Sequence, residues 1–155
     1  MYTYVIRHEA TIATAITAIQ LKASASGPFE ILGATATQRG STTSAQEAIA
    51  LVRKTVAATV TIAVAGTHVF KAKTNDPTAG LQLGTAATGV IGTAEGTDGD
   101  IACKLGFNVL SGYVYLPVPE ARIWVPAAGL IALKFLNAPA TQTWDLEMII
   151  REYLG

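Results

Sequence analysis

The feature of this sequence that most constrains its fold is an alternation of apolar and polar residues with a period of two. Between residues 100 and 109 the apolar members share one phase, namely Ile101, Cys103, Leu105, Phe107 and Val109. Residues 143–151 repeat the pattern, with Trp144, Leu146, Met148 and Ile150 in one phase. Successive side chains of a β-strand point to opposite faces of a sheet, so each pattern predicts a half-buried strand. We therefore expect Cys103 to be a buried, unreactive thiol.

Shorter alternating runs predict further strands. They lie around residues 2–6, 16–23, 29–37, 49–51, 60–64, 113–116 and 131–135. Between them stand turn-forming combinations of Gly, Pro, Asn, Asp and Ser, such as Ser26-Gly27-Pro28 and Asn75-Asp76-Pro77. About nine or ten short strands predict an all-β fold, either a β-sandwich or a jelly-roll-like barrel.

Two segments also fit a helix. In 11–21, Ile12, Ile16 and Ile19 have helical spacing, but the β-branched residues of this segment disfavour a helix, and we expect a strand. Residues Thr43–Ala50 are a candidate for a short helix.

Residues 66–97 are rich in Gly, Ala and Thr and have no sustained period. They predict one long loop with a short strand around Val90 and Ile91. A connection of this length in a compact domain is usually functional. We expect this loop and the N-terminal region to reach toward neighbouring subunits. A chain of 155 residues predicts a single domain over 1–155.

The composition excludes several classes of protein. The chain has 11 basic and 11 acidic residues, and only 14% of its residues are charged, against about 25% in ordinary domains. With no net charge there is no general attraction to phosphate, so nucleic acid is not an expected partner. The longest apolar stretch, Ile123–Leu133, contains Pro126 and Gly129. It is too short to span a membrane, and we expect no membrane partner.

A search for catalytic chemistry finds few candidates. The two histidines, His8 and His68, have only Cys103 as a possible nucleophilic partner, and the pattern places that residue in the core. We therefore expect neither an enzyme nor a cofactor. Glu95, Asp98 and Asp100 offer the oxygen ligands that calcium prefers, but their spacing is not that of an EF-hand. An ordinary turn explains them better, and we expect no metal site.

Aromatic residues and prolines in the second half suggest a contact surface. Prolines in a strand favour a sheet edge, because they have no N–H to donate. An edge that carries Tyr and Trp is suited to protein contacts. The predicted interface residues are Tyr113, Tyr115, Pro117, Pro119 and Trp124. Two alternatives remain: the aromatics cover the end of the core, or Tyr113, Tyr115 and Trp124 form a stacking platform in a carbohydrate-binding module.

The second half also carries a succession of short motifs. They are Phe107-Asn108-Val109, Gly112-Tyr113, Pro117 with Pro119-Glu120-Ala121-Arg122, a 126–129 turn, Leu130-Ile131-Ala132-Leu133 and Ala138-Pro139-Ala140. In this order they resemble a family of small virion proteins of tailed bacteriophages and prophages. Asn75–Gly80 and Phe29-Glu30-Ile31 are similar to a loop and a strand of the same family.

The resemblance implies a head decoration or cement protein. Such a protein binds the outside of the major capsid protein lattice, commonly as a homotrimer, and so belongs to the outer surface of the virion. The sparse charge and the 27 alanines and 20 threonines suit extensive protein contacts. A tail or neck component and a jelly-roll shell protein are the alternatives within the same class, and copy number per particle separates them.

Overall fold

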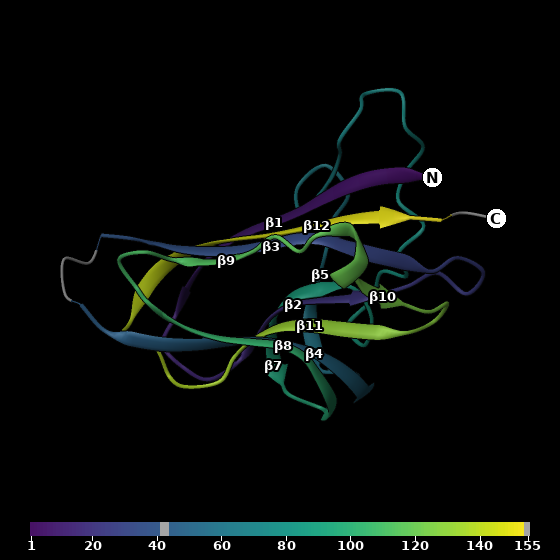
Figure 1. The fold of residues 1–155 in the computed structure, drawn as a ribbon. Helices are drawn as coiled ribbons and strands as arrows, with labels where there is room; N and C mark the ends of the chain where they lie inside the picture. The colour runs from purple at the N-terminus through teal and green to yellow at the C-terminus, as the bar shows by residue number, and fades with distance from the viewer. Residues whose placement is uncertain (41–43, 154–155) are drawn as a thin grey trace.

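The computed structural model describes residues 1–40 and 44–153, and it is a sandwich of two antiparallel sheets (Figure 1). Sheet A contains β1 (Tyr2–Ile12), β3 (Phe29–Arg39), β6 (Val69–Lys71), β9 (Tyr113–Tyr115), β10 (Ile123–Val125) and β12 (Gln142–Glu152). Sheet B contains β2 (Thr17–Lys22), β4 (Gln46–Val56), β5 (Thr59–Ile62), β7 (Gly89–Ala94), β8 (Thr97–Asn108) and β11 (Leu130–Phe135). A 3-10 turn, η1 (Pro119–Ala121), is the one helical element of the described residues.

The strand order places both chain ends in the middle of sheet A. Its order is β10-β3-β12-β1-β6, with β9 also paired to β3, and sheet B has the order β5-β7-β2-β11-β4-β8. β1 pairs with β12 along its whole length, from Tyr2 opposite Glu152 to Ile12 opposite Gln142. The N-terminal region, which we expected to reach toward neighbouring subunits, is instead held within its own sheet by pairing on both sides of β1.

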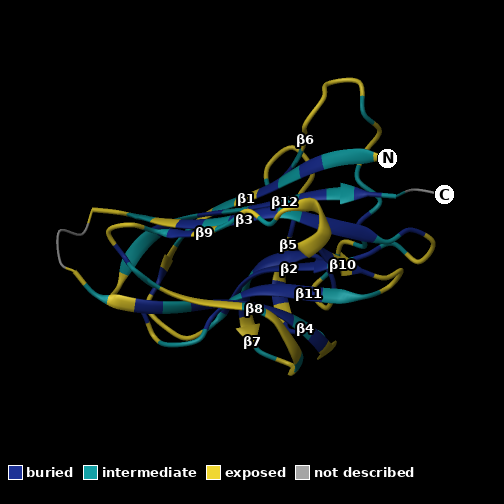
Figure 2. Cartoon of the chain, viewed as in Figure 1, coloured by how far each residue is buried: buried dark blue, intermediate teal, exposed yellow. Residues whose placement is uncertain are grey.

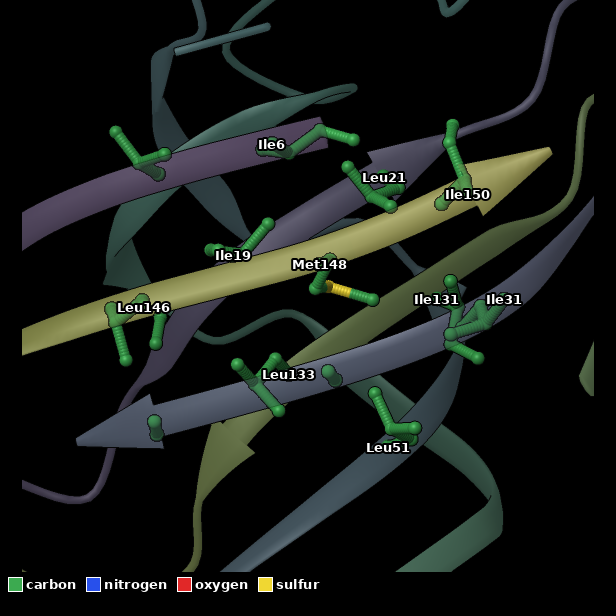
Figure 3. Packing of buried hydrophobic residues seen from close by; sticks show 14 of the residues in the cluster. Ile6, Ile19, Leu21, Ile31, Leu51, Ile131, Leu133, Leu146, Met148 and Ile150 are labelled. Carbon is green, nitrogen blue, oxygen red and sulfur yellow. The ribbon is translucent and has the colours of Figure 1, made fainter. Parts of the chain in front are cut away.

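The core lies between the two sheets and follows the predicted alternation. Met148 and Ile150 of β12 are fully buried and face Ile19 and Leu133 of sheet B (Figure 3). Trp144 is the largest fully buried side chain, and its ring meets Phe135 edge-on at 4.9 Å. Burial of each such side chain contributes about 1.5–3 kcal/mol. The apolar side chains of the period-two pattern therefore form the core that holds the two sheets together.

The all-β sandwich prediction is confirmed, with twelve strands rather than nine or ten. Residues 11–21 are not helical, but they form the end of β1 and most of β2 with a bend over 13–16, rather than one strand. The short helix over Thr43–Ala50 is wrong: β4 begins at Gln46, and Thr43 lies outside the described residues. β4 is a strand because it pairs on both sides, with β11 and with β8, and because Ile49 and Leu51 fill the core.

The predicted long loop contains two strands. β7 covers the expected strand at Val90 and Ile91, and β6 adds to the edge of sheet A. The connection after β6 stands out beyond sheet A as a teal loop in Figure 1. Its base is tied to the domain: the Tyr4 hydroxyl donates to Pro77 O (3.0 Å), and Gly80 N–H donates to the Glu152 carboxylate (2.9 Å).

β8 departs from its predicted burial. Val109, just after the strand, is buried and Cys103 and Phe107 pack partly against the core, but Ile101 and Leu105 are 54% and 42% exposed. β8 is the last strand of sheet B, and much of it is exposed (Figure 2). Its register to β4 shifts three times, and such bulges twist an edge strand. The expectation of a fully buried Cys103 is therefore wrong; the thiol is half-buried.

Candidate docking surface

The candidate site lies where the free edges of the two sheets come together. β9 and β10 both pair with the same edge of β3, and the segment 116–122 between them leaves the sheet. Pro117 and Pro119 lie in this segment, and Pro119 begins η1. A proline has no N–H to donate to a ladder, which explains why pairing stops here and resumes at Ile123. On the other sheet β8 is the edge, and it contacts β9.

The five predicted interface residues fall into different environments. Tyr113 is 1% exposed, and its ring meets Phe107 edge-on at 5.9 Å. Its predicted place in a contact surface is not supported, because β9 directs this side chain into the core. The alternative that the aromatics cover the core therefore holds for Tyr113. Tyr115 is half-buried, and its hydroxyl donates to Ala121 O (3.2 Å).

Trp124 and Pro119 are the exposed members of the predicted set. Trp124 is 47% exposed and its ring lies 5.1 Å from that of Tyr153. Its carbonyl accepts a hydrogen bond from the Arg53 guanidinium (2.9 Å), which joins β10 to β4 of the other sheet. Pro119 is exposed and Pro117 is half-buried. The stacking platform of Tyr113, Tyr115 and Trp124 is not formed, since the three rings do not share one surface.

Sequence reasoning missed three aliphatic residues of the same segment. Val114, Leu116 and Val118 are 50%, 70% and 63% exposed. They occupy the opposite phase of the alternation that buries Tyr113, so the period-two pattern was a signal for them. Leu116 lies close to β3 at Gly33, where an added Cβ would lie 2.8 Å from Leu116 Cδ2.

We call the exposed apolar set on these two edges the docking side. It consists of Ile101, Leu105, Val114, Leu116, Val118 and Trp124. These are six of the twelve large apolar side chains that are exposed in the described residues. Half of the exposed apolar side chains therefore gather at the edges formed by β8, β9, η1 and β10. Exposed apolar groups that are scattered singly need no explanation, whereas a group of them along two adjoining sheet edges is a candidate contact surface.

A buried carboxylate fixes the end of the docking side at β10. Glu30, on β3, is 9% exposed and accepts from Arg122 (3.3 Å), Arg151 (3.0 Å) and the Tyr153 hydroxyl (2.7 Å). Its hydrogen bond is the main reason that the pKa of Tyr153 is raised. Because Trp124 is the neighbour of Glu30 across the strands, this network holds the exposed ring in position.

The acidic turn proposed as a possible ion site is neutralised by lysines. Lys54 Nζ lies 2.7 Å from Asp98 and 3.3 Å from Glu95, and Lys134 Nζ lies 2.6 Å and 3.1 Å from the same carboxylates. Asp100 lies on β8 outside this cluster. Among the described residues, no group of three or more His, Cys, Asp or Glu side chains could hold a metal ion.

The two histidines and the cysteine are not assembled into one site. His8 and His68 lie with ring centroids 5.2 Å apart beside β1 and β6, whereas Cys103 lies on β8 of sheet B. Burial lowers the pKa of His8, and the neighbouring His68 lowers it further. The geometry therefore gives the histidines no cysteine nucleophile to activate.

In the described part of the chain, no helix is long and apolar enough to cross a membrane. Comparison with family models, with curated proteins and with solved structures finds no match to this chain.

Proposed function

We propose that this protein is a structural virion protein, a head decoration protein that binds the outside of the major capsid lattice and stabilises the head. The observation that carries the proposal is the docking side. Six exposed apolar side chains line the unpaired edges of both sheets in a chain with only 14% charged residues. A second protein that covered them would remove their remaining apolar area from water, which favours association by about 25 cal/mol per Å² before the entropic cost of binding.

Three of the motifs behind the family resemblance lie in the same region. Pro117, Pro119 and Arg122 belong to the segment between β9 and β10, and Gly112-Tyr113 leads into it. Arg122 is ion-paired with Glu30, which belongs to the separate Phe29-Glu30-Ile31 motif. Two motifs that are far apart in the sequence thus meet at one end of the docking side. This convergence supports the idea that they serve one surface.

The charge balance favours the outer surface of the capsid. A protein that lined the genome-filled interior would need a basic face, and this chain has no net charge. We propose a homotrimer as the assembled form, with the major capsid protein as the partner of the docking side. A tail or neck component would use similar contacts, and a low copy number per particle would identify it.

The test is addition of the purified protein to expanded phage capsids that lack it. Light scattering of the free protein should give a trimer, and cosedimentation should show saturable binding to capsids. Leu116→Asp should abolish this binding, since it places a charge in the most exposed part of the docking side. A monomer that ignores the capsids would overturn the proposal.

The matched control is Ile62→Asp. Ile62 is 45% exposed and lies on β5, at the opposite edge of sheet B from β8. This variant introduces the same charge at an exposed apolar position away from the docking side. We expect it to bind capsids as the unaltered protein does. Equal losses in Leu116→Asp and Ile62→Asp would contradict the assignment of the docking side.

A further inference from the structure

A groove of about 540 Å³ crosses the outer face of sheet A, away from the core. Its floor is formed by side chains of β1, β12 and β3 that alternate with core residues such as Ile6 and Met148. Its wall is the segment that leads into β6, with His68 and Phe70. Three adjacent strands make a floor roughly 10 Å wide. The volume lies within the range of about 300–1,000 Å³ that is typical of small-molecule sites.

The strand register arranges the floor in two polar rows. In the first row Thr35, Glu147 and Arg7 are direct cross-strand neighbours. Arg7 Nε donates to Glu147 Oε2 at 2.5 Å. The row therefore presents a hydroxyl, a carboxylate and a guanidinium side by side on three strands.

In the second row Thr37, Asp145 and Glu9 are neighbours in the same way. Arg39 makes ion pairs with both carboxylates, at 2.9 Å to Asp145. Within the described residues, the hydroxyls of Thr35 and Thr37 have no hydrogen-bond partner. The floor thus holds three carboxylates and the Arg7 guanidinium, with Arg39 paired at its margin, and leaves two hydroxyls without a partner among the described residues.

The wall adds a directed donor and an aromatic ring. Val64 N–H donates to His68 Nδ1 (3.0 Å), so the neutral imidazole carries its hydrogen on Nε2. Phe70 is half-buried, and the Arg7 guanidinium lies 5.9 Å from the centre of its ring. The half-buried ring offers apolar surface next to the polar rows.

The charges of the groove largely neutralise one another. Arg7 is paired with Glu147, and Arg39 is shared by Glu9 and Asp145. A free anion would meet three carboxylates, and a free cation would compete with two guanidiniums that are already in place. An uncharged ligand with many hydroxyls meets neither obstacle, because each hydroxyl both donates and accepts a hydrogen bond. Sugar rings have this chemistry around the rim and C–H groups on their faces, which suit an aromatic ring.

We propose that this groove binds a neutral saccharide. The hydroxyls of Thr35 and Thr37, the carboxylates of Asp145 and Glu147 and the His68 Nε2–H supply the polar contacts. Phe70 supplies the apolar contact. This site differs from the docking side, and it does not depend on the proposed role in a virion.

The test is titration of the ¹⁵N-labelled protein with maltotriose, cellotriose, chitotriose and mannotriose. At least one of these probes should shift the amide signals of β1, β3 and β12 around the groove. The double variant Thr35→Val/Thr37→Val keeps the size of both side chains and removes both hydroxyls. We expect it to weaken binding about tenfold, the effect of two lost hydrogen bonds.

The matched control is Thr11→Val, which removes a hydroxyl from the same face of β1 outside the lining of the groove. It should bind the saccharide as the unaltered protein does, and added salt should change neither affinity. Three outcomes would overturn the proposal: no shift with any of the four probes, equal binding by the double variant, or shifts with spermidine that disappear in salt. The last result would identify a site for cations instead.

Discussion

Both sheets carry charged clusters on their outer faces, and the two clusters differ in burial. On sheet B the side chain of Lys54 is fully buried, and Lys134 is 15% exposed. On sheet A the side chains of Arg7 and Arg39 are 60% and 55% exposed. Exposed ion pairs add about 0–1 kcal/mol, whereas removing one partner of a buried pair is strongly destabilising. The cluster on sheet B is therefore part of the fold, whereas the one on sheet A contributes little to its stability.

The difference arises from two crossings of the chain over sheet B. The connection β4–β5 (57–58) and the turn β7–β8 (95–96) both form hydrogen bonds with β2 on its outer face. Gln20 of β2 points to this face, where its amide donates to Ala87 O and Ala58 O and accepts from Ala58 N–H. Glu95, in the second crossing, accepts from Thr17 N–H (2.6 Å). Among residues 1–40 and 44–153, no such segment covers Arg7 or Arg39 of sheet A, and their ion pairs stay in contact with solvent.

The largest expected loss of stability comes from Gly96→Ala, which adds a Cβ where the two crossings are in contact. Gly96 has φ +65°, and an added Cβ would lie 2.5 Å from Val56 O and would also collide with Ala57 O. Strain and collision together should lower the free energy of unfolding by about 3 kcal/mol. Urea unfolding monitored by tryptophan fluorescence measures the loss.

The control is Gly40→Ala. Gly40 has φ +91°, but nothing lies within 4 Å of an added Cβ, so only the backbone preference is lost. We expect this variant to lose about 1 kcal/mol. If both variants lost the same amount, the contact between the crossings would not contribute to stability.

Lys54→Met tests the buried charge itself. It removes an ammonium that donates to Glu95 O (2.5 Å) and pairs with Asp98 (2.7 Å). A broken buried pair costs about 3–5 kcal/mol, but Lys134 remains and the carboxylates are a third exposed, so we expect a loss of about 2 kcal/mol. Lys104→Met, at an exposed position of β8 without an ion pair in the described residues, should change stability by less than about 0.5 kcal/mol. If Lys54→Met lost less than about 0.5 kcal/mol as well, the cluster would contribute little to the stability of the fold.

The sequence predicted the fold better than it predicted the surfaces. The alternation around Met148 and Trp144 identified core strands, because burial on one face imposes a period of two. The same alternation wrongly predicted that Ile101 and Leu105 are buried, because it carries no information about the position of a strand in the sheet order. An edge strand keeps the alternating sequence, but its apolar side chains are not fully covered by neighbouring strands. The candidate helix at Thr43–Ala50 is wrong because the only large apolar residue of this segment, Ile49, takes its place through long-range pairing, which the local sequence does not display.

The sequence predicted only part of the candidate site, and the reason is similar. Prolines marked the segment 116–122 correctly as a departure from the sheet, since the missing N–H is a local property. The direction of each side chain depends on the pairing of β9 with β3, which the sequence does not display. Tyr113 therefore proved buried, and Leu116 was missed. The lysine partners of Glu95 and Asp98 come from β4 and β11, far away in the sequence, so the acidic turn could be read only as a turn or an ion site.

A third prediction uses pH to test the contribution of the cluster on sheet B to stability. Burial alone would raise the pKa of Glu95 and Asp98, but hydrogen bonds from Thr17 to Glu95 and the lysines beside both carboxylates outweigh it and lower both pKa values. A carboxylate with a lowered pKa in the folded state stabilises the fold above its unfolded value and loses this contribution as the pH falls. The ordinary values are 4.5 for Glu95 and 3.8 for Asp98. The urea midpoint should therefore fall as the pH is lowered below about 4.5.

The matched variant for this prediction is Glu95→Gln, which keeps the shape of the side chain and removes its titration. It should be less stable than the unaltered protein at neutral pH and should lose less on acidification. Burial raises the pKa of Glu152, which has the opposite effect on the pH dependence, but Glu152 is present in both proteins and its effect cancels in the comparison. If the stabilities of the two proteins fell in parallel with pH, the interaction of Glu95 with its lysine partners would not stabilise the fold.

The smallest effect is expected for Arg7→Met in the groove of sheet A. Arg7 is 60% exposed and Glu147 is 27% exposed, so water solvates the carboxylate when the guanidinium is removed. The change in the free energy of unfolding should stay below about 0.5 kcal/mol, and a double-mutant cycle with Glu147→Gln should give a coupling of the same size. Urea unfolding at two salt concentrations measures both quantities. A coupling above about 1 kcal/mol would place this pair among the structural contacts of the fold, like Lys54, and would remove the distinction between the two faces. A small coupling would mean that the ion pair of the groove adds little to folding, as the proposed saccharide site requires.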